Sequence, residues 1–237
     1  MNFQLFSRYI YKTIFHKSPG YQWGRFSFVP SKENAHKLPK NIKFFESASP
    51  VALEQVTSSM QIYLDFITKT EEQKLLDEVE HVLKRIRYET SHWDDAIHNY
   101  RETEHLRWKP DNQKIIERVR QTAFASNAKH IKYVHILDIA KDGFIKPHVD
   151  SVRFCGDTIS GISLLSDSVM RLALEQDKTV FVDILLNRRS LYIMRGDSRY
   201  KFTHEILDDK TSYFRGQHVP RDRRISVICR NEPPNEE

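Results

Sequence analysis

The fold of this chain is decided by short β-branched runs, which read 132-KYVHILDIA-140, 144-FIKPHVD-150, 158-TISGISLL-165, 168-SVMRLALE-175, 179-TVFVDILL-186, 190-SLYIMRG-196 and 223-RRISVICR-230. Runs of this length that are rich in Val, Ile and Leu, with turn residues between them, predict β-strands. A succession of such strands favours an antiparallel sandwich, barrel or jelly roll.

Two helices are expected before these strands. Thr70 and Glu71 begin a capping-box arrangement, so the pattern predicts a helix over 71–87 with one apolar face. A second helix is expected after Pro110, with Asp111 as its cap. The apolar positions are Leu75, Leu76, Val79, Val82, Leu83 and Ile86 in the first helix, and Ile115, Ile116, Val119 and Phe124 in the second. The fold class is therefore mainly β with flanking helices.

The composition is that of one globular domain with a short appendage. The chain has 237 residues, 39% of them hydrophobic, and two cysteines, Cys155 and Cys229. Two cysteines are too few for a disulfide framework or a thiolate zinc site, and no run approaches the roughly 18 consecutive apolar residues of a membrane-spanning helix. We expect a protein with reduced thiols and no membrane span.

The positive charge is concentrated at the N-terminus. Residues 1–50 carry eight basic and two acidic residues, a net of +6, whereas the chain as a whole carries +5. The remaining residues are close to neutral, so a phosphate-binding surface would have to be local. The first acidic residue is Glu33, and an acid-poor segment with Arg and Ser predicts a mitochondrial transit peptide over 1–50, followed by a globular domain over 51–237. The alternative is a disordered basic tail of a cytosolic protein.

A candidate metal-binding pair lies in the second of the strand-like runs. His148 and Asp150 are two residues apart, and side chains at this spacing share one face of a strand. The same spacing recurs by chance in a chain of this composition, at His92 and Asp94. We interpret the second pair as part of a turn between the two helices, because it lies outside the strand-like runs.

The last strand-like run has two chemically different faces. One face has Arg224, Ser226, Ile228 and Arg230, and the other has Ile225, Val227 and Cys229. The apolar face belongs against the body of the protein. The arginine face is either solvent-exposed or directed at an anionic small molecule, because arginine binds carboxylates with two parallel hydrogen bonds. A metal pair and a late arginine together suit a site for a metal and a keto acid.

The third metal ligand is expected to be a histidine from a late strand, and His204 is the candidate. Two histidines and one carboxylate leave coordination positions open, as in non-haem Fe(II) oxygenases. His135 is a rival, but its place among apolar residues predicts a core histidine bonded to backbone.

These residues resemble a known family. The chain has His148-x-Asp150, then His204, then Arg224 and Arg230, and it contains the strings SHWDDAIHNYRETE, IKPHVDSVRFCG, GISLLSDSVMRL, HEIL and PRDRRISVICR. It is similar to the AlkB family of Fe(II)- and 2-oxoglutarate-dependent dioxygenases, particularly to its mitochondrial branch in animals. The resemblance implies a double-stranded β-helix, a mitochondrial matrix location, and Fe(II), 2-oxoglutarate and O2 as cofactor and co-substrates. More loosely, it implies roles in regulated necrosis and fatty-acid metabolism.

The resemblance also assigns residues. By position, His148, Asp150 and His204 match the iron ligands, and no catalytic residue is implied beyond them. Arg224 matches the arginine that binds the distal carboxylate of 2-oxoglutarate, and Tyr192 and Arg230 match residues that complete that site. The family's Asn-x-Tyr is missing on the strand before the metal pair, where the chain has Leu137 or Asp138 to Ala140, and Tyr192 is expected to replace its tyrosine.

The substrate is less well defined. The interval between the first helix and the metal pair leaves little sequence for the hairpins of a nucleotide-gripping lid, which disfavours duplex DNA. A protein or other non-DNA substrate ranks first, N-methylated mitochondrial RNA second, and a binding module with little turnover third. Aromatic and basic residues favour RNA, because they could stack on bases and contact phosphates. Acidic residues in the same stretch argue against RNA, because they bring its net charge close to zero. The two sets are Arg85, Arg87, Tyr88, Trp93, Tyr100, Arg101, Arg107 and Trp108, and Glu89, Asp94, Asp95, Glu102 and Glu104. We expect a monomer.

Overall fold

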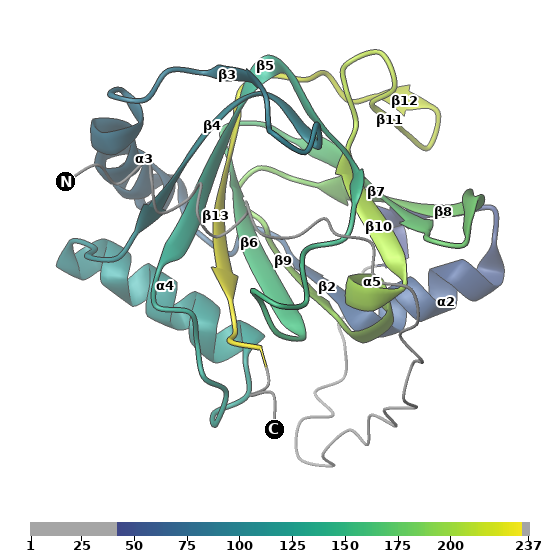
Figure 1. Ribbon diagram of the computed structural model, residues 1–237, viewed down its shortest axis with the longest axis horizontal. Coiled ribbons are helices and arrows are strands. Elements are labelled where there is room, and N and C mark those ends of the chain that lie inside the picture. Colours follow the sequence, from purple (N-terminus) through teal and green to yellow (C-terminus); the bar gives the residue numbers. More distant parts are fainter. Residues whose placement is uncertain (1–41, 234–237) are drawn as a thin grey trace. The chain divides into compact units, whose positions relative to one another are not determined.

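A computed structural model describes residues 42–233 of the chain (Figure 1). The transit-peptide prediction for residues 1–50 therefore lies mostly outside the described residues. The described part begins inside that predicted segment. Its first residues pack on the domain, since Phe44 and Phe45 are buried and residues 45–46 pair with a strand of the domain.

The described elements follow the chain in this order. They are the 3₁₀ helix η2 (Ile42–Phe44), β1 (Phe45–Glu46), α2 (Pro50–Ser59), β2 (Met60–Tyr63), α3 (Lys69–Leu83), β3 (Glu89–Ser91), β4 (Ile97–His105), α4 (Pro110–Ala123), β5 (Val134–His148), β6 (Thr158–Leu164), β7 (Ser168–Leu174), β8 (Asp177–Leu186), β9 (Leu191–Arg195), α5 (Gly196–Tyr200), β10 (Phe202–Ile206), β11 (Tyr213–Phe214), β12 (Gln217–His218) and β13 (Arg224–Arg230). Each strand-like run of the sequence contains a strand, and all strand pairs are antiparallel. The prediction of a mainly β domain with flanking helices is confirmed.

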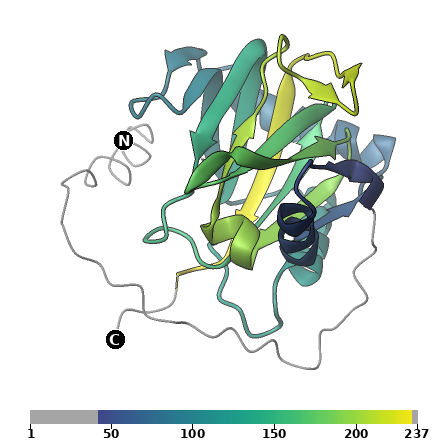
Figure 2. The same ribbon diagram turned by 90° about the vertical axis from the view of Figure 1, so that its right-hand side faces the viewer.

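Apart from β11 and β12, which pair only with each other, the strands form one curled sheet whose two halves face each other. The major half has the order β5-β13-β6-β9-β2, with β4 on the far side of β5, and the minor half has the order β10-β7-β8-β1. Strand β5 belongs to both halves. Its first part, Val134–Ile139, pairs with β4 and β13, and its last part reaches β10 through Ile145 and His148. In Figure 2 the strands of the minor half lie in front of the yellow strand β13.

Two helices cover the outer face of the major half (Figure 1). Helix α3 begins two residues before the predicted start, because Thr68 rather than Thr70 is its cap: the Thr68 hydroxyl accepts from the Glu71 backbone N–H and Glu71 accepts from the Thr68 N–H. The prediction of Asp111 as the cap of α4 is also wrong. Lys109 holds that position without a side-chain bond, and Asp111 lies in the first turn.

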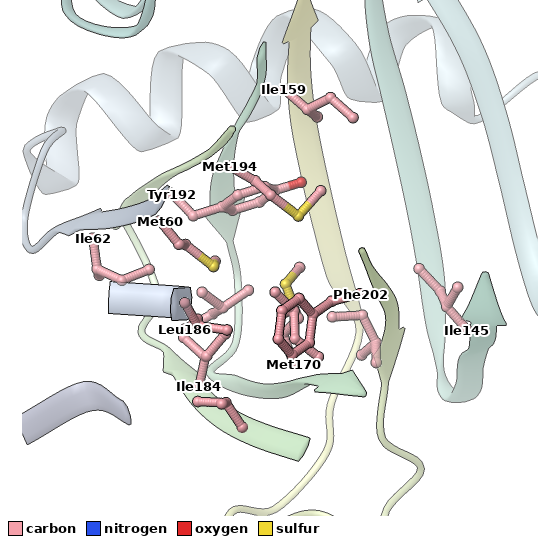
Figure 3. Packing of buried hydrophobic residues seen from close by; sticks show 14 of the residues in the cluster. Met60, Ile62, Ile145, Ile159, Met170, Ile184, Leu186, Tyr192, Met194 and Phe202 are labelled. Carbon is pink, nitrogen blue, oxygen red and sulfur yellow. The ribbon is translucent and has the colours of Figure 1, made fainter. Parts of the chain in front are cut away.

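Two hydrophobic clusters lie on opposite sides of the major half. The outer cluster packs Leu75, Val79 and Ile116 of the helices against the strands, and it includes Val227 of β13. The inner cluster fills the space between the two halves and includes Met170, Tyr192 and Phe202 (Figure 3). The predicted alternation of β13 is confirmed, because Ile225, Val227 and Cys229 face the helices and Ile228 faces inward. The arginine face of β13 therefore points into the barrel and not into solvent.

A β-hairpin joins the two helices, where the sequence had predicted a simple turn. Residues 89–91 pair with β4, and β4 continues along β5 from Ile97 to His105. The sequence pattern concealed this hairpin because β4 is only half-buried and its run of polar residues lacks the apolar alternation of a strand. The expectation that this interval leaves little sequence for hairpins is therefore wrong, because it contains the β3–β4 hairpin.

Candidate metal centre and co-substrate site

Three side chains meet where the major and minor halves join. His204 on β10 lies directly opposite His148, the last residue of β5, and Asp150 follows His148 by two residues. One ligand atom from each of the three lies within 4.8 Å of the others, and the nearer Asp150 oxygen, Oδ1, is 3.5 Å from Nε2 of each histidine. The predicted group His148, Asp150 and His204 is thus brought together by the fold.

The three members of this group have different pKa shifts: burial alone would lower the pKa of His148, but its contact with the Asp150 carboxylate raises it. Burial on its own would raise the pKa of Asp150, but the Arg230 guanidinium and the two imidazoles hold that pKa well below its usual range. Burial and the charge of His148 lower the pKa of His204 to about 3. Nδ1 of His148 lies 2.9 Å from the Lys146 carbonyl, so Nδ1–H donates there and Nε2 is left for a ligand. The site therefore offers one carboxylate and imidazole nitrogens to a cation.

Arg230 binds the carboxylate of this group from the side. Its Nε and Nη2 lie 3.2 and 3.1 Å from Oδ2 of Asp150, so the guanidinium donates to the oxygen that faces away from the histidines. The remaining oxygen, Oδ1, is the one that approaches His148 and His204.

Arg224 and Tyr192 lie deeper between the two halves. Arg224 is buried, its Nη2 donates to the Ser163 hydroxyl at 2.9 Å, and its Nε has no hydrogen-bond partner. Burial lowers the pKa of Arg224 to about 10, still above neutral pH, so the side chain remains a cation. Tyr192 belongs to the inner cluster (Figure 3). Burial raises the pKa of its hydroxyl group, and the positive charge of Arg224 acts in the opposite direction.

A further buried arginine was missed by the sequence analysis. Arg221 precedes β13, is 2% exposed, and has two nitrogens, Nε and Nη1, without a partner. Its Nη2 donates to the Gly143 carbonyl at 3.4 Å, and its charge contributes to the lowered pKa of Arg224. The local sequence PRDRR does not predict that Arg221 is buried while its neighbour Asp222 is exposed. It also does not separate Arg221 from Arg223, which pairs with Asp138.

The rival residues lie beside the metal group but outside it. Among residues 42–233, His148, Asp150 and His204 are the one group of at least three His, Cys, Asp or Glu side chains that is close enough to hold an ion. His92 and Asp94 bond to each other at 2.6 Å at the tip of the β3–β4 hairpin. The prediction that His135 bonds to backbone is wrong, because its two ring nitrogens contact the Glu102 and Arg230 side chains.

The residues of the site fit a metal and a dicarboxylate. Two histidines and one carboxylate form the donor set that non-haem Fe(II) enzymes use, and this set leaves positions open for other ligands. The unpaired N–H groups of the buried Arg224 and Arg221 require an acceptor, because a buried donor without a partner costs about 1–3 kcal/mol. A carboxylate is the acceptor that a guanidinium binds best.

Two mitochondrial proteins are similar to this chain over most of its length. It is 45% identical over 203 residues to the Mus musculus protein named "Alpha-ketoglutarate-dependent dioxygenase alkB homolog 7, mitochondrial", which covers 86% of this chain and 92% of the mouse protein. It is 51% identical over 168 residues to the Bos taurus protein of the same name, which covers 71% of this chain and 76% of the bovine protein. The chain belongs to the AlkB family of 2-oxoglutarate-dependent dioxygenases.

Solved structures confirm the fold expected of an AlkB-family protein. The structure of OsALKBH1 has a TM-score of 0.53 and 14% identity to this chain, covering 73% of this chain and 97% of its own. A Pseudomonas putida prolyl-4-hydroxylase has a TM-score of 0.53 and 12% identity, covering 74% and 93%. The expected jelly-roll core is confirmed. No protein-family model matches the chain.

Membership of the AlkB family makes the protein an enzyme that uses Fe(II), 2-oxoglutarate and O2. The chain departs from the family's usual Asn-x-Tyr, because the corresponding part of β5 presents the buried Leu137 and Ile139 to the interior. None of the helices between residues 42 and 233 has the length and apolar character that a membrane crossing requires.

Proposed function

We propose that His148, Asp150 and His204 hold the Fe(II) ion of this dioxygenase. The observation that carries the proposal is that one atom from each residue lies within 4.8 Å of the others at the junction of the two halves of the barrel. Bound there, Fe(II) supplies the activation of O2 that oxidises 2-oxoglutarate to succinate and CO2 and hydroxylates a substrate C–H bond. The role of the protein's own side chains is to hold the ion and to orient the co-substrate beside it.

The proposed co-substrate site uses Arg224, Tyr192 and Arg230. The Arg224 guanidinium, fixed on one side by Ser163, binds the distal carboxylate of 2-oxoglutarate, which provides an acceptor for its unpaired Nε–H. The Tyr192 hydroxyl hydrogen-bonds beside it, in place of the tyrosine that the strand β5 lacks. Arg230 is assigned to the end of the co-substrate nearer the metal, where it already holds Asp150.

The proposed substrate is a protein or another mitochondrial molecule other than DNA. Three of the aromatic and basic residues that favoured RNA are engaged within the protein: Tyr100 is 2% exposed, Arg101 donates to Asp138 at 2.7 Å, and Tyr88 lies against the Arg101 guanidinium. Tyr100 therefore offers no stacking face and Arg101 is engaged by a carboxylate, whereas Tyr88 remains 41% exposed. Because the β3–β4 hairpin is present, a lack of sequence for hairpins no longer disfavours nucleic acid. The order of the proposed substrates rests on these contacts and on the near-neutral charge of the domain.

The proposed location is the mitochondrial matrix. Two similar proteins bear the word mitochondrial in their names, and residues 1–50 have the basic, acid-poor composition of a transit peptide. Roles in regulated necrosis and fatty-acid metabolism belong to the same proposal and follow from the family resemblance. A monomeric state is also part of the proposal.

Incubation of the Fe(II)-loaded protein with 2-oxoglutarate, and separately with mitochondrial matrix proteins or methylated mitochondrial tRNA, tests this function. We expect succinate together with a 16 Da mass increase on a protein, and neither in the His148→Ala variant. Formaldehyde that appears only with RNA would reverse the order of the two substrates. Absence of succinate under all conditions with Fe(II), ascorbate and O2 would instead support a binding module.

A further inference from the structure

A continuous row of polar contacts leads from the proposed metal ligand Asp150 to the β3–β4 hairpin. It starts at Arg230, whose Nε and Nη2 hold Oδ2 of Asp150 at 3.2 and 3.1 Å. The third nitrogen of the same guanidinium, Nη1, lies 3.0 Å from Nδ1 of His135. Asp150 and His135 thus bind opposite parts of one arginine side chain.

The row continues from His135 toward the hairpin tip. Nε2 of His135 lies 2.9 Å from Oε2 of Glu102, which lies on β4. The other oxygen of Glu102 lies 3.9 Å from Nε2 of His92, and Nδ1 of His92 lies 2.6 Å from Asp94. Residues from β13, β5, β4 and the hairpin tip are therefore connected in one row, although the sequence places them far apart.

The chemistry of each partner fixes the orientation of the His135 ring. Arginine can only donate hydrogen bonds, so Nδ1 of His135 must accept from Arg230. The proton of that ring is then on Nε2 and is donated to the Glu102 carboxylate. An imidazole is suited to this place because it accepts on one side and donates on the other.

The orientation of Arg230 matters because it decides which oxygen of Asp150 faces the metal. Arg230 holds Oδ2, and this leaves Oδ1 at 3.5 Å from Nε2 of both His148 and His204. A guanidinium held only at one end could rotate about its long, flexible side chain, whereas a bond at Nη1 restricts that rotation. Partners of this kind around a metal ligand typically affect affinity and activity 10- to 100-fold.

We propose that His135, supported by Glu102, is a positioning residue that holds Arg230 in place for the metal ligand Asp150 and the co-substrate. The inference rests on the metal and co-substrate sites proposed above and extends them to the β3–β4 hairpin. A side chain that ranked as a rival metal ligand in the sequence thus has a different role, since it contacts the partner of a ligand and not the metal group itself.

The experiment measures metal and co-substrate binding separately. His135→Leu removes both ring bonds, and His135→Gln retains an acceptor and a donor. We expect His135→Leu to keep stoichiometric Mn(II) but to weaken 2-oxoglutarate binding to the Mn(II)-loaded protein by about tenfold, the effect of one hydrogen bond to a charged group. His135→Gln restores most of this affinity. The visible absorption band of the Fe(II)–2-oxoglutarate complex shifts in His135→Leu and returns in His135→Gln.

Two further variants keep the test informative. Glu102→Leu removes the support of His135 from another strand and is expected to reproduce the loss. His98→Leu is the control, because His98 lies on β4 as well but stacks on Phe144 and bonds Asp95 outside the row. A His135→Leu variant with the co-substrate affinity and absorption band of the His98→Leu control would overturn the inference alone. Stoichiometric Mn(II) retained by His148→Ala would overturn the proposed metal site and the inference together.

Discussion

The ring of Tyr192 occupies the space above Gly161 on the neighbouring strand. The two residues are paired across β9 and β6, and a Cβ atom placed at Gly161 would lie 2.6 to 2.7 Å from the ring carbons and hydroxyl of Tyr192. Contacts this short cannot exist without movement of the ring. Gly161 therefore determines where the hydroxyl of Tyr192 lies relative to Arg224.

The first prediction is that Gly161→Ala displaces Tyr192. We expect a loss of about 1–3 kcal/mol in the free energy of unfolding, the usual cost of overpacking, together with weaker binding of 2-oxoglutarate. Denaturant unfolding and co-substrate titration measure the two effects. Ile162→Val on the same strand is the control, because Ile162 faces the helices and its shortening affects stability only. Unchanged co-substrate binding in Gly161→Ala would contradict the assignment of Tyr192.

The second prediction concerns the metal ligands. His148→Ala and Asp150→Ala are expected to abolish stoichiometric Mn(II) binding while the domain stays folded, as judged by circular dichroism. His92→Ala is the control, since His92 has the same spacing to an aspartate but lies at the hairpin tip. Loss of the metal in His92→Ala but not in His148→Ala would move the site to the hairpin.

The third prediction concerns the fork of Arg224. Arg224→Lys keeps the positive charge but loses the planar pair of donors, so we expect the affinity for 2-oxoglutarate to fall at least about tenfold. Isothermal titration of the Mn(II)-loaded variant gives the dissociation constant. Arg215→Lys, at an exposed position, is expected to match the unmodified protein. An unchanged affinity in Arg224→Lys would place the carboxylate anchor elsewhere.

The fourth prediction concerns the unpaired donors of Arg221. Burial lowers the pKa of Arg221, which reflects the cost of holding a charged group away from water. Replacement by Met fills a similar volume without unpaired N–H groups, so Arg221→Met is expected to raise the melting temperature of the protein without co-substrate. Differential scanning calorimetry measures the change. A lower melting temperature would show that Arg221 is satisfied by its surroundings, including the charge of Asp209.

The fifth prediction is a loss of stability at acid pH. A histidine in an unfolded chain titrates near pH 6.5, whereas the pKa of His204 in the folded protein is about 3. Between these values only the unfolded chain binds the His204 proton, so this residue makes the free energy of unfolding decrease as pH falls from about 6.5 to about 3. The raised pKa of His148 opposes part of this loss. The low pKa of Asp150 adds a loss in the same direction below about pH 4.

Melting temperatures of the chelator-treated protein across this range measure the effect. His204→Gln has no group to titrate at this position, so its melting temperature should vary less between pH 4 and 6.5. An equal slope in both proteins would assign the acid sensitivity to other groups.

The inner and outer faces of β13 were predictable because a strand alternates with a period of two. Seven residues from Arg224 to Arg230 contain both the apolar contacts with the helices and the two inward arginines, so one short string predicts a strand, its faces and a site. His148 and Asp150 could be proposed as a pair from their spacing at the end of a strand-like run, although Asp150 lies just beyond the end of β5, and His204 could be proposed as a histidine from a late strand.

Other features depend on contacts that no local pattern encodes. The Glu102 and His135 pair joins residues 33 positions apart, and β4 gains its strand conformation from pairing with β5 and not from its own polar sequence. Arg221 is buried, and its contacts are with Gly143 and Asp209, which are distant in the sequence. The start of α3 was misplaced by two residues because Thr68 and Thr70 each have a possible capping-box partner three residues later, Glu71 and Gln73.

Within residues 42–233, strands β5 and β10 are the one pair that joins the two halves of the curled sheet. Their pairing is short and irregular, with His204 opposite His148, Ile206 opposite Ile145 and a shift of register between them. An ion bound by His148 and His204 would cross-link the halves where their own hydrogen bonding is weakest. A bound metal ion would then stabilise the closed barrel. At a free metal concentration one hundred times its dissociation constant, it would add about 2.7 kcal/mol to the free energy of unfolding.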